Sequence, residues 1–206
     1  MPEWPAFDYE AAARAGRIVY RLDPQRSRID VVARSDGPLA RFGHDHAVVV
    51  AAPEGYLLLD DRPDRPLPAR ADLRFETRRL EVDAPDARGR HGLASEMSEA
   101  DVAGTRRNLL EKVLDADTAP WVTLAMSEFQ VQGEQASAAV EVALQGRQYR
   151  QRQPFRLRFD EGRLTVEGRF VLRHSDLGLT PYTAFGGSLR VADPLEVHFT
   201  LVGVQP

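Results

Sequence analysis

Most of the chain alternates between apolar and polar residues with a period of two. The clearest case is the segment 69–76, in which every odd-numbered residue is apolar and every even-numbered residue is charged. Successive side chains of a β-strand point to opposite faces, so this pattern predicts a strand with one apolar face and one wet face. Further segments of the same kind are separated by turn residues, and they are 17–23, 28–34, 121–133, 135–146, 153–162, 163–175 and 194–204. Residues 46–61 predict two short strands or one bent strand, broken by Pro53 and Gly55.

Two segments carry a helical pattern instead. Residues 7–15 are rich in good helix formers and are followed by Gly16, which predicts a short helix near the start of the chain. In the segment 97–120, Ser98 is a candidate N-cap, with Asp101 three residues later. The apolar stripe of this second helix consists of Leu109, Leu110, Val113 and Leu114. The stretch 83–93 before it predicts an exposed loop.

These elements favour an all-β protein, an antiparallel barrel of about eight strands with one inserted α-helix and a short N-terminal helix. We divide the chain into an N-terminal extension, residues 1–16, and a barrel domain, residues 17–206. An eight-stranded barrel encloses room for packed side chains or for one small ligand.

Composition narrows the function further. The chain has 206 residues, 43% of them apolar, with a net charge of −4 and no cysteine. These values are typical of a globular protein, give no reason to expect nucleic acid, and exclude disulfides and thiolate chemistry. No apolar run is long enough for a transmembrane segment, and the first residues lack the pattern of a secretion signal. We therefore expect a cytoplasmic protein.

Four stretches resemble landmarks of the YceI family, and together they cover most of residues 17–204. They are 20–34 with its D-P-x-x-S motif, 108–124 with a Leu/Asp-rich helix ending before a proline, 166–179 with an S-D-x-G turn, and the closing strand in 186–201. The resemblance implies a lipocalin-like barrel whose apolar interior holds a polyisoprenoid or similar lipid. Family members are often exported to the periplasm, and this chain departs from them in lacking a signal and in its "FGHDH" element.

His44 and His46 flank Asp45 at the start of an apolar run. If all three lie in a strand, the two imidazoles point the same way, about 6.6 Å apart at roughly 3.3 Å per residue. Such a pair can bind a metal ion, contact the polar end of a ligand, or simply end a strand. A metal would need further ligands from the remaining histidines, which are His91, His174 and His198. We favour contact with the ligand's polar end, with Asp45 turned toward solvent or local backbone.

The leading hypothesis is a non-enzymatic carrier of an elongated apolar small molecule such as an isoprenoid or lipid. The sequence lacks nucleophile-elbow, phosphate-loop and dinucleotide motifs, and no cofactor is expected. The residues expected to contact the ligand are His44, His46, Val31, Val48, Val50, Leu73, Phe75, Leu124, Phe170, Leu172, Tyr182, Phe185 and Phe199. One rival is a metal-binding protein or metal-dependent enzyme centred on His44 and His46. Another is a scaffold with a filled core, acting through its surface as a homodimer.

Overall fold

A computed structural model describes residues 4–60, 62, 67–93, 96–160 and 162–205. Eight antiparallel strands form a closed barrel, as the alternation predicts, because β12 pairs with β10 on one edge and with β1 on the other. In order around the barrel they are β1 (Val19–Leu22), β4 (Glu54–Leu59), β5 (Pro68–Glu76), β7 (Trp121–Gln132), β8 (Gln135–Leu144), β9 (Arg147–Asp160), β10 (Arg163–Arg173) and β12 (Leu189–Val204).

Four further strands among the described residues extend the sheet at one end. β2 (Arg28–Asp36) follows β1 along the same edge of β12, β3 (His46–Val50) pairs with β2, and β6 (Leu80–Val82) pairs with β3. β11 (Thr183–Ala184) pairs with β12. The segment 46–61 therefore forms two strands, β3 and β4, interrupted at residues 51–53, where Pro53 lies.

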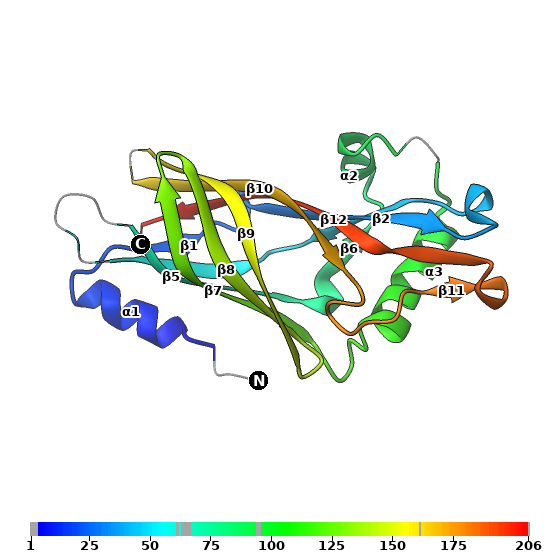
Figure 1. The fold of residues 1–206 in the computed structure, drawn as a ribbon, viewed down its shortest axis with the longest axis horizontal. Coiled ribbons are helices and arrows are strands. Elements are labelled where there is room, and N and C mark those ends of the chain that lie inside the picture. Colours follow the sequence, from blue (N-terminus) through cyan, green and yellow to red (C-terminus); the bar gives the residue numbers. More distant parts are fainter. Residues whose placement is uncertain (1–3, 61, 63–66, 94–95, 161, 206) are drawn as a thin grey trace.

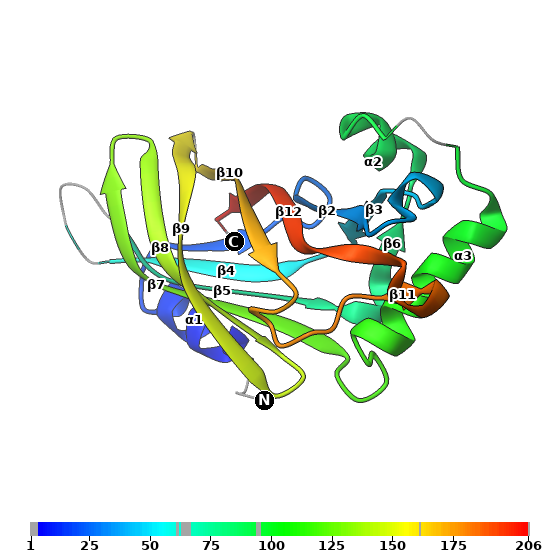
Figure 2. The same ribbon diagram turned by 45° about the vertical axis from the view of Figure 1, so that its right-hand side comes forward.

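Three α-helices and four single turns accompany the described strands. They are α1 (Ala6–Arg14), α2 (Pro85–Arg90) and α3 (Glu99–Asn108), with single turns η1 (Ala40–Phe42), η2 (Thr77–Arg79), η3 (Leu109–Val113) and η4 (Phe185–Gly187). Figures 1 and 2 show α2 and α3 at the end of the barrel that also carries β3, β6 and β11. The prediction of an exposed loop over residues 83–93 is wrong, because this stretch contains α2 with Ala87 and Arg88 buried. Within the described residues no helix is long and apolar enough to cross a membrane.

The N-terminal helix α1 packs on the outer side of the barrel against β4 and β5. Tyr9 is buried, its ring stacks on Tyr56 with centroids 5.0 Å apart, and its hydroxyl donates to Asp72 over 2.6 Å. Burial and the carboxylate of Asp72 raise the pKa of Tyr9, so the phenol keeps its proton and remains a donor. The helix is thus attached to the barrel, and the division of the chain at residue 16 stays a prediction.

The inserted helix begins where its cap predicts. The backbone N–H of Asp101 donates to the Ser98 hydroxyl over 3.2 Å. The last turn, η3, is a π turn, in which residues five apart are joined, as between the N–H of Leu114 and the carbonyl of Leu109. This wider turn changes which residues share a face. Leu109, Val113 and Leu114 belong to the apolar cluster inside the barrel, whereas Leu110 does not.

Candidate functional site: the barrel interior and a fork in its wall

The apolar faces of the strands point into the barrel. The register pairs Val31 with Val48 and with Val197, and pairs Leu73 with Leu124, so these side chains share the inner face. They belong to one apolar cluster, which also contains the following residues from the predicted ligand site: Val50, Phe75, Phe170, Leu172, Tyr182 and Phe199. Val197, Leu73 and Val50 are buried, but the other eight are only half-buried although they lie on the inner face. The inner face therefore presents solvent-accessible apolar surface.

The barrel wall divides between β9 and β10. Their ladder runs from the pair Arg163–Asp160 to the pair Glu167–Arg156 and ends there. Beyond this point β9 stays paired with β8 alone, and β10 stays paired with β12. Pro154 lies next to the last pair and has no N–H to donate, which suits a strand with a free edge. We call this division the fork.

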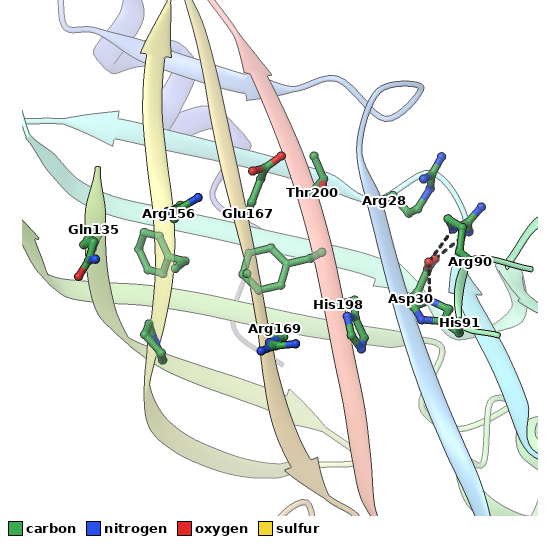
Figure 3. A pocket seen from close by; sticks show the side chains of 15 residues that line it. Arg28, Asp30, Arg90, His91, Gln135, Arg156, Glu167, Arg169, His198 and Thr200 are labelled. Carbon is green, nitrogen blue, oxygen red and sulfur yellow. Dashed lines mark hydrogen bonds and ion pairs between the residues drawn. The ribbon is translucent and has the colours of Figure 1, made fainter. Parts of the chain in front are cut away.

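A groove of about 800 Å³ lies at the fork. Phe155, Gly168 and Phe199 contribute its apolar part, and their strand positions face the barrel interior. A Cβ on Gly168 would lie 2.6 Å from Cζ of Phe199, so only glycine lets this ring rest against β10. Figure 3 shows Arg156 on β9, Arg169 on β10 and His198 on β12 around the groove. The groove therefore combines interior apolar surface with charged groups of the outer face.

Polar side chains line the inner face of β9 beside the fork. The register sets Tyr149, Gln151 and Gln153 opposite Val142, Val140 and Ala138 of β8, which places them on the inner face. Tyr149 donates to the Gln151 amide oxygen, and Gln153 is buried. Burial and the carboxylate of Asp176 raise the pKa of Tyr149, which keeps the phenol protonated at neutral pH. β9 thus contributes three neighbouring hydrogen-bonding side chains to the inner face.

His44 and His46 do not lie on one strand face. β3 begins at His46, so His44 lies before the strand and is exposed, and the prediction that both imidazoles share a strand face is wrong. His46 pairs with Ala33 of β2 and so lies on the inner face, in phase with Val48. Asp45 turns to local groups, as predicted, accepting from the Ser35 backbone N–H over 2.9 Å and from Arg34 over 3.0 Å.

A buried carboxylate holds His46 in place. Asp83, whose side chain is fully buried, lies 2.7 Å from His46 Nδ1 and accepts from Arg88 over 2.7 Å and from the Ala47 backbone N–H over 3.0 Å. Burial alone would raise the pKa of Asp83, but these hydrogen bonds outweigh it and hold the pKa below its ordinary value. The imidazole is therefore fixed at the rim of the interior through one ring nitrogen.

A second carboxylate on the outer face fixes helix α2. Asp30 of β2 is buried and accepts from Arg90 over 3.1 and 3.2 Å, and its carboxylate lies 2.9 Å from His91 Nε2. The His91 ring contacts that of His198, with centroids 4.8 Å apart. Figure 3 shows this cluster at one side of the groove. Across the described part of the chain, no three His, Asp or Glu side chains form a group that could hold a metal ion.

The loop before β12 separates its two aromatic residues. Tyr182 packs against the interior cluster, and its ring lies 5.2 Å from the ammonium group of Lys112. Phe185 lies in η4, is 75% exposed and is not part of the interior cluster. Ligand contact stays a prediction for all the residues proposed from the sequence, but His44 and Phe185 do not face the interior cluster.

A closed antiparallel barrel with an apolar interior defines a lipocalin-like architecture, and comparison with solved structures agrees. The chain is similar in fold to BcnA of Burkholderia cenocepacia, with a TM-score of 0.62 and 14% identity over 88% of this chain and 98% of that chain. It is also similar to a Campylobacter jejuni YceI protein, with a TM-score of 0.53 and 9% identity over 74% of this chain and 81% of that chain. Neither a family model nor a curated protein matches the sequence. The protein has a YceI-like fold.

Proposed function

We propose that this protein binds one elongated apolar molecule, isoprenoid- or lipid-like, inside its barrel and carries or sequesters it without chemical change. The observation that supports this proposal is the set of half-buried apolar side chains on the inner face, among them Val31, Val48 and Phe170. Apolar surface next to solvent-sized space is unfavourable by roughly 25 cal/mol per Å², so an apolar ligand that covers it is stabilised. The YceI-like fold is consistent with this use of the interior.

The direct test is to extract protein purified from its own host with organic solvent and to analyse the extract by mass spectrometry. We expect a long-chain apolar compound at a substantial molar fraction. Metal analysis of the same sample tests the rival hypothesis of a metal-binding protein. One tightly held metal ion per chain, with no lipid in the extract, would support metal binding and contradict the carriage of a lipid.

Val48 and Val49 provide a matched pair of variants for a binding assay. Both are half-buried neighbours on β3, but Val48 faces the interior cluster and Val49 faces outward. Val48→Phe should reduce the space for a ligand and weaken displacement of a dansylated fatty acid by geranylgeraniol about tenfold or more, equivalent to about 1.4 kcal/mol. Val49→Phe should leave the affinity nearly unchanged. Equal effects of the two variants, together with clean extracts, would contradict binding in the interior.

His46 is proposed to contact the polar end of the ligand. Its position on the inner face and its fixed Nδ1 support this role, and His44 serves as the exposed control. His46→Asn can still donate to Asp83 but removes the outer nitrogen of the ring. Loss of one hydrogen bond of about 1 kcal/mol should weaken binding of an isoprenoid alcohol about fivefold. The same variant should not change the affinity for a hydrocarbon of equal length, and His44→Asn should change neither.

A further inference from the structure

The outer faces of β9 and β10 carry a concentration of arginine. Positions that alternate with interior residues such as Phe155 and Phe170 point outward, and most of them are basic. We call this surface the arginine face, and it consists of Arg150, Arg152, Arg156 and Arg158 on β9 with Arg163, Arg169 and Arg173 on β10. All seven side chains are exposed.

Fewer carboxylates accompany these arginines. They include Asp160 and Glu167 on the same face, Glu128 of β7, Glu141 opposite Arg150 on β8, and Asp176 and Asp193 near Arg173. Glu128 pairs with Arg150 and Arg152. Among the described residues no ion pair holds Arg156, Arg158 or Arg169. Because the whole chain has a net charge of −4 while this face is positive, the rest of the molecule is acidic. The protein therefore has a strong charge asymmetry across the barrel.

The fork lies within the arginine face. Arg156 forms one side of the last pair in the β9–β10 ladder, and Arg169 follows directly after the groove residue Gly168. The apolar rings of Phe155 and Phe199 lie in the same groove. The groove is lined by four arginines, Arg28, Arg90, Arg156 and Arg169, and by two carboxylates, Asp30 and Glu167, so basic groups outnumber acidic ones where the wall opens toward apolar surface. An anionic phospholipid bilayer has the complementary arrangement, with negative headgroups above apolar chains.

Nucleic acid fits this face less well. Proteins that bind single strands combine a basic groove with exposed aromatic side chains on which bases stack. The outward positions of β9 and β10 hold no aromatic residue, and the one large apolar side chain among them is Val171, which is 50% exposed. The outward side chains of the arginine face therefore supply charge for an anionic partner, and the aromatic rings of Phe155 and Phe199 lie in the groove at inward-facing strand positions.

We propose that the arginine face binds the surface of an anionic phospholipid bilayer, with the fork turned toward the lipid. Docking itself requires only the arginines. The further idea that a docked protein takes up its ligand from the bilayer through the fork rests on the proposed function of the barrel.

Vesicle sedimentation tests the docking. The protein should bind vesicles of phosphatidylcholine with 30% phosphatidylglycerol, release at 0.5 M NaCl, and leave pure phosphatidylcholine vesicles unbound. One arginine near an anionic surface contributes about 1 kcal/mol, which is about fivefold in affinity. The combined variant Arg156→Gln, Arg158→Gln and Arg169→Gln should therefore bind about a hundredfold more weakly. The matching lysine variant should retain most of the binding.

A control variant removes three exposed arginines elsewhere, Arg14, Arg62 and Arg78. Arg14 lies on α1, which covers β4 and β5 across the barrel from the arginine face. The control should lose less than about twofold, since these charges lie off the docking surface. The proposal is overturned by equal losses in both glutamine variants, by equal binding to neutral and anionic vesicles, or by preferential binding of single-stranded RNA over anionic vesicles. Binding to anionic vesicles that also carry geranylgeraniol, without uptake of the geranylgeraniol, would instead refute the barrel's proposed function and leave the docking intact.

Discussion

Replacing Asp83 with Asn tests whether the buried carboxylate is an organising centre of the barrel end. Asn keeps the shape of the side chain and tolerates the positive φ of 55° at this position, so the substitution removes the charge with little change in backbone preference. The substitution leaves Arg88 without its carboxylate partner, and the Arg88 side chain is only 8% exposed. Breaking a buried ion pair by removing one partner costs about 3–5 kcal/mol, because the other charge stays buried.

The assay is urea unfolding followed by circular dichroism. The expected result is a lower midpoint with an unchanged slope, corresponding to that loss of about 3–5 kcal/mol. Asp86→Asn in the same helix is the matched control. Its side chain is 73% exposed and pairs with Arg90, so removing its charge should cost less than about 1 kcal/mol. Similar losses in the two variants would refute the reasoning from burial.

The pH dependence gives the prediction a second readout. Because folding lowers the pKa of Asp83, its contribution is fully present above the unfolded-state value of about 3.9 and is lost as the pH falls through the folded-state value. The difference in stability between the wild type and Asp83→Asn should be similar at pH 6 and pH 5 and should shrink below about pH 4. A difference that grows in acid would show that the charge of Asp83 does not stabilise the fold.

Two further substitutions test the fork and the helix cap. Gly168→Ala should displace the Phe199 ring and lower the free energy of unfolding by about 1–3 kcal/mol through overpacking. In a double-mutant cycle, Phe199→Leu should recover part of this loss, and additive effects of the two substitutions would contradict the contact. Ser98→Ala should cost about 1 kcal/mol in thermal or urea unfolding by removing the cap of α3, whereas Ser98→Asp should preserve stability, and equal losses in both variants would count against the cap.

The sequence predicts the faces of the strands well, because alternation in a half-buried strand is imposed by the core. All nine strand residues proposed for the interior, from Val31 to Phe199, lie on the inner face. The inward positions of Tyr149, Gln151 and Gln153 could not be predicted in this way. These residues alternate with arginines rather than with apolar residues, so the pattern does not show which face is inside.

Features that depend on tertiary contacts are the ones that sequence reasoning misses. The helix α2 contains Pro85, Gly89 and no apolar stripe. It is held by Arg88, which contacts the Asp45 carbonyl and the Asp83 carboxylate, and by Arg90, which pairs with Asp30 on β2 sixty residues earlier in the chain. The start of β3 at His46 likewise depends on pairing with β2, which local pattern does not show. Pro154 and Gly168 are the residues in the sequence that could have indicated the fork. They do so only once the fold brings both of them to the same groove.

The closure of the barrel joins the two ends of the chain. Arg21 on β1 pairs with Val204 on β12, the last strand in the sequence. On the ribosome, β1 and β10 would therefore keep open edges until β12 has emerged, and unpaired edges are templates for association with other chains. Contacts between such distant residues also form slowly. The barrel should consequently close only after β12 has emerged, and truncation within β12 should leave an open sheet prone to aggregate.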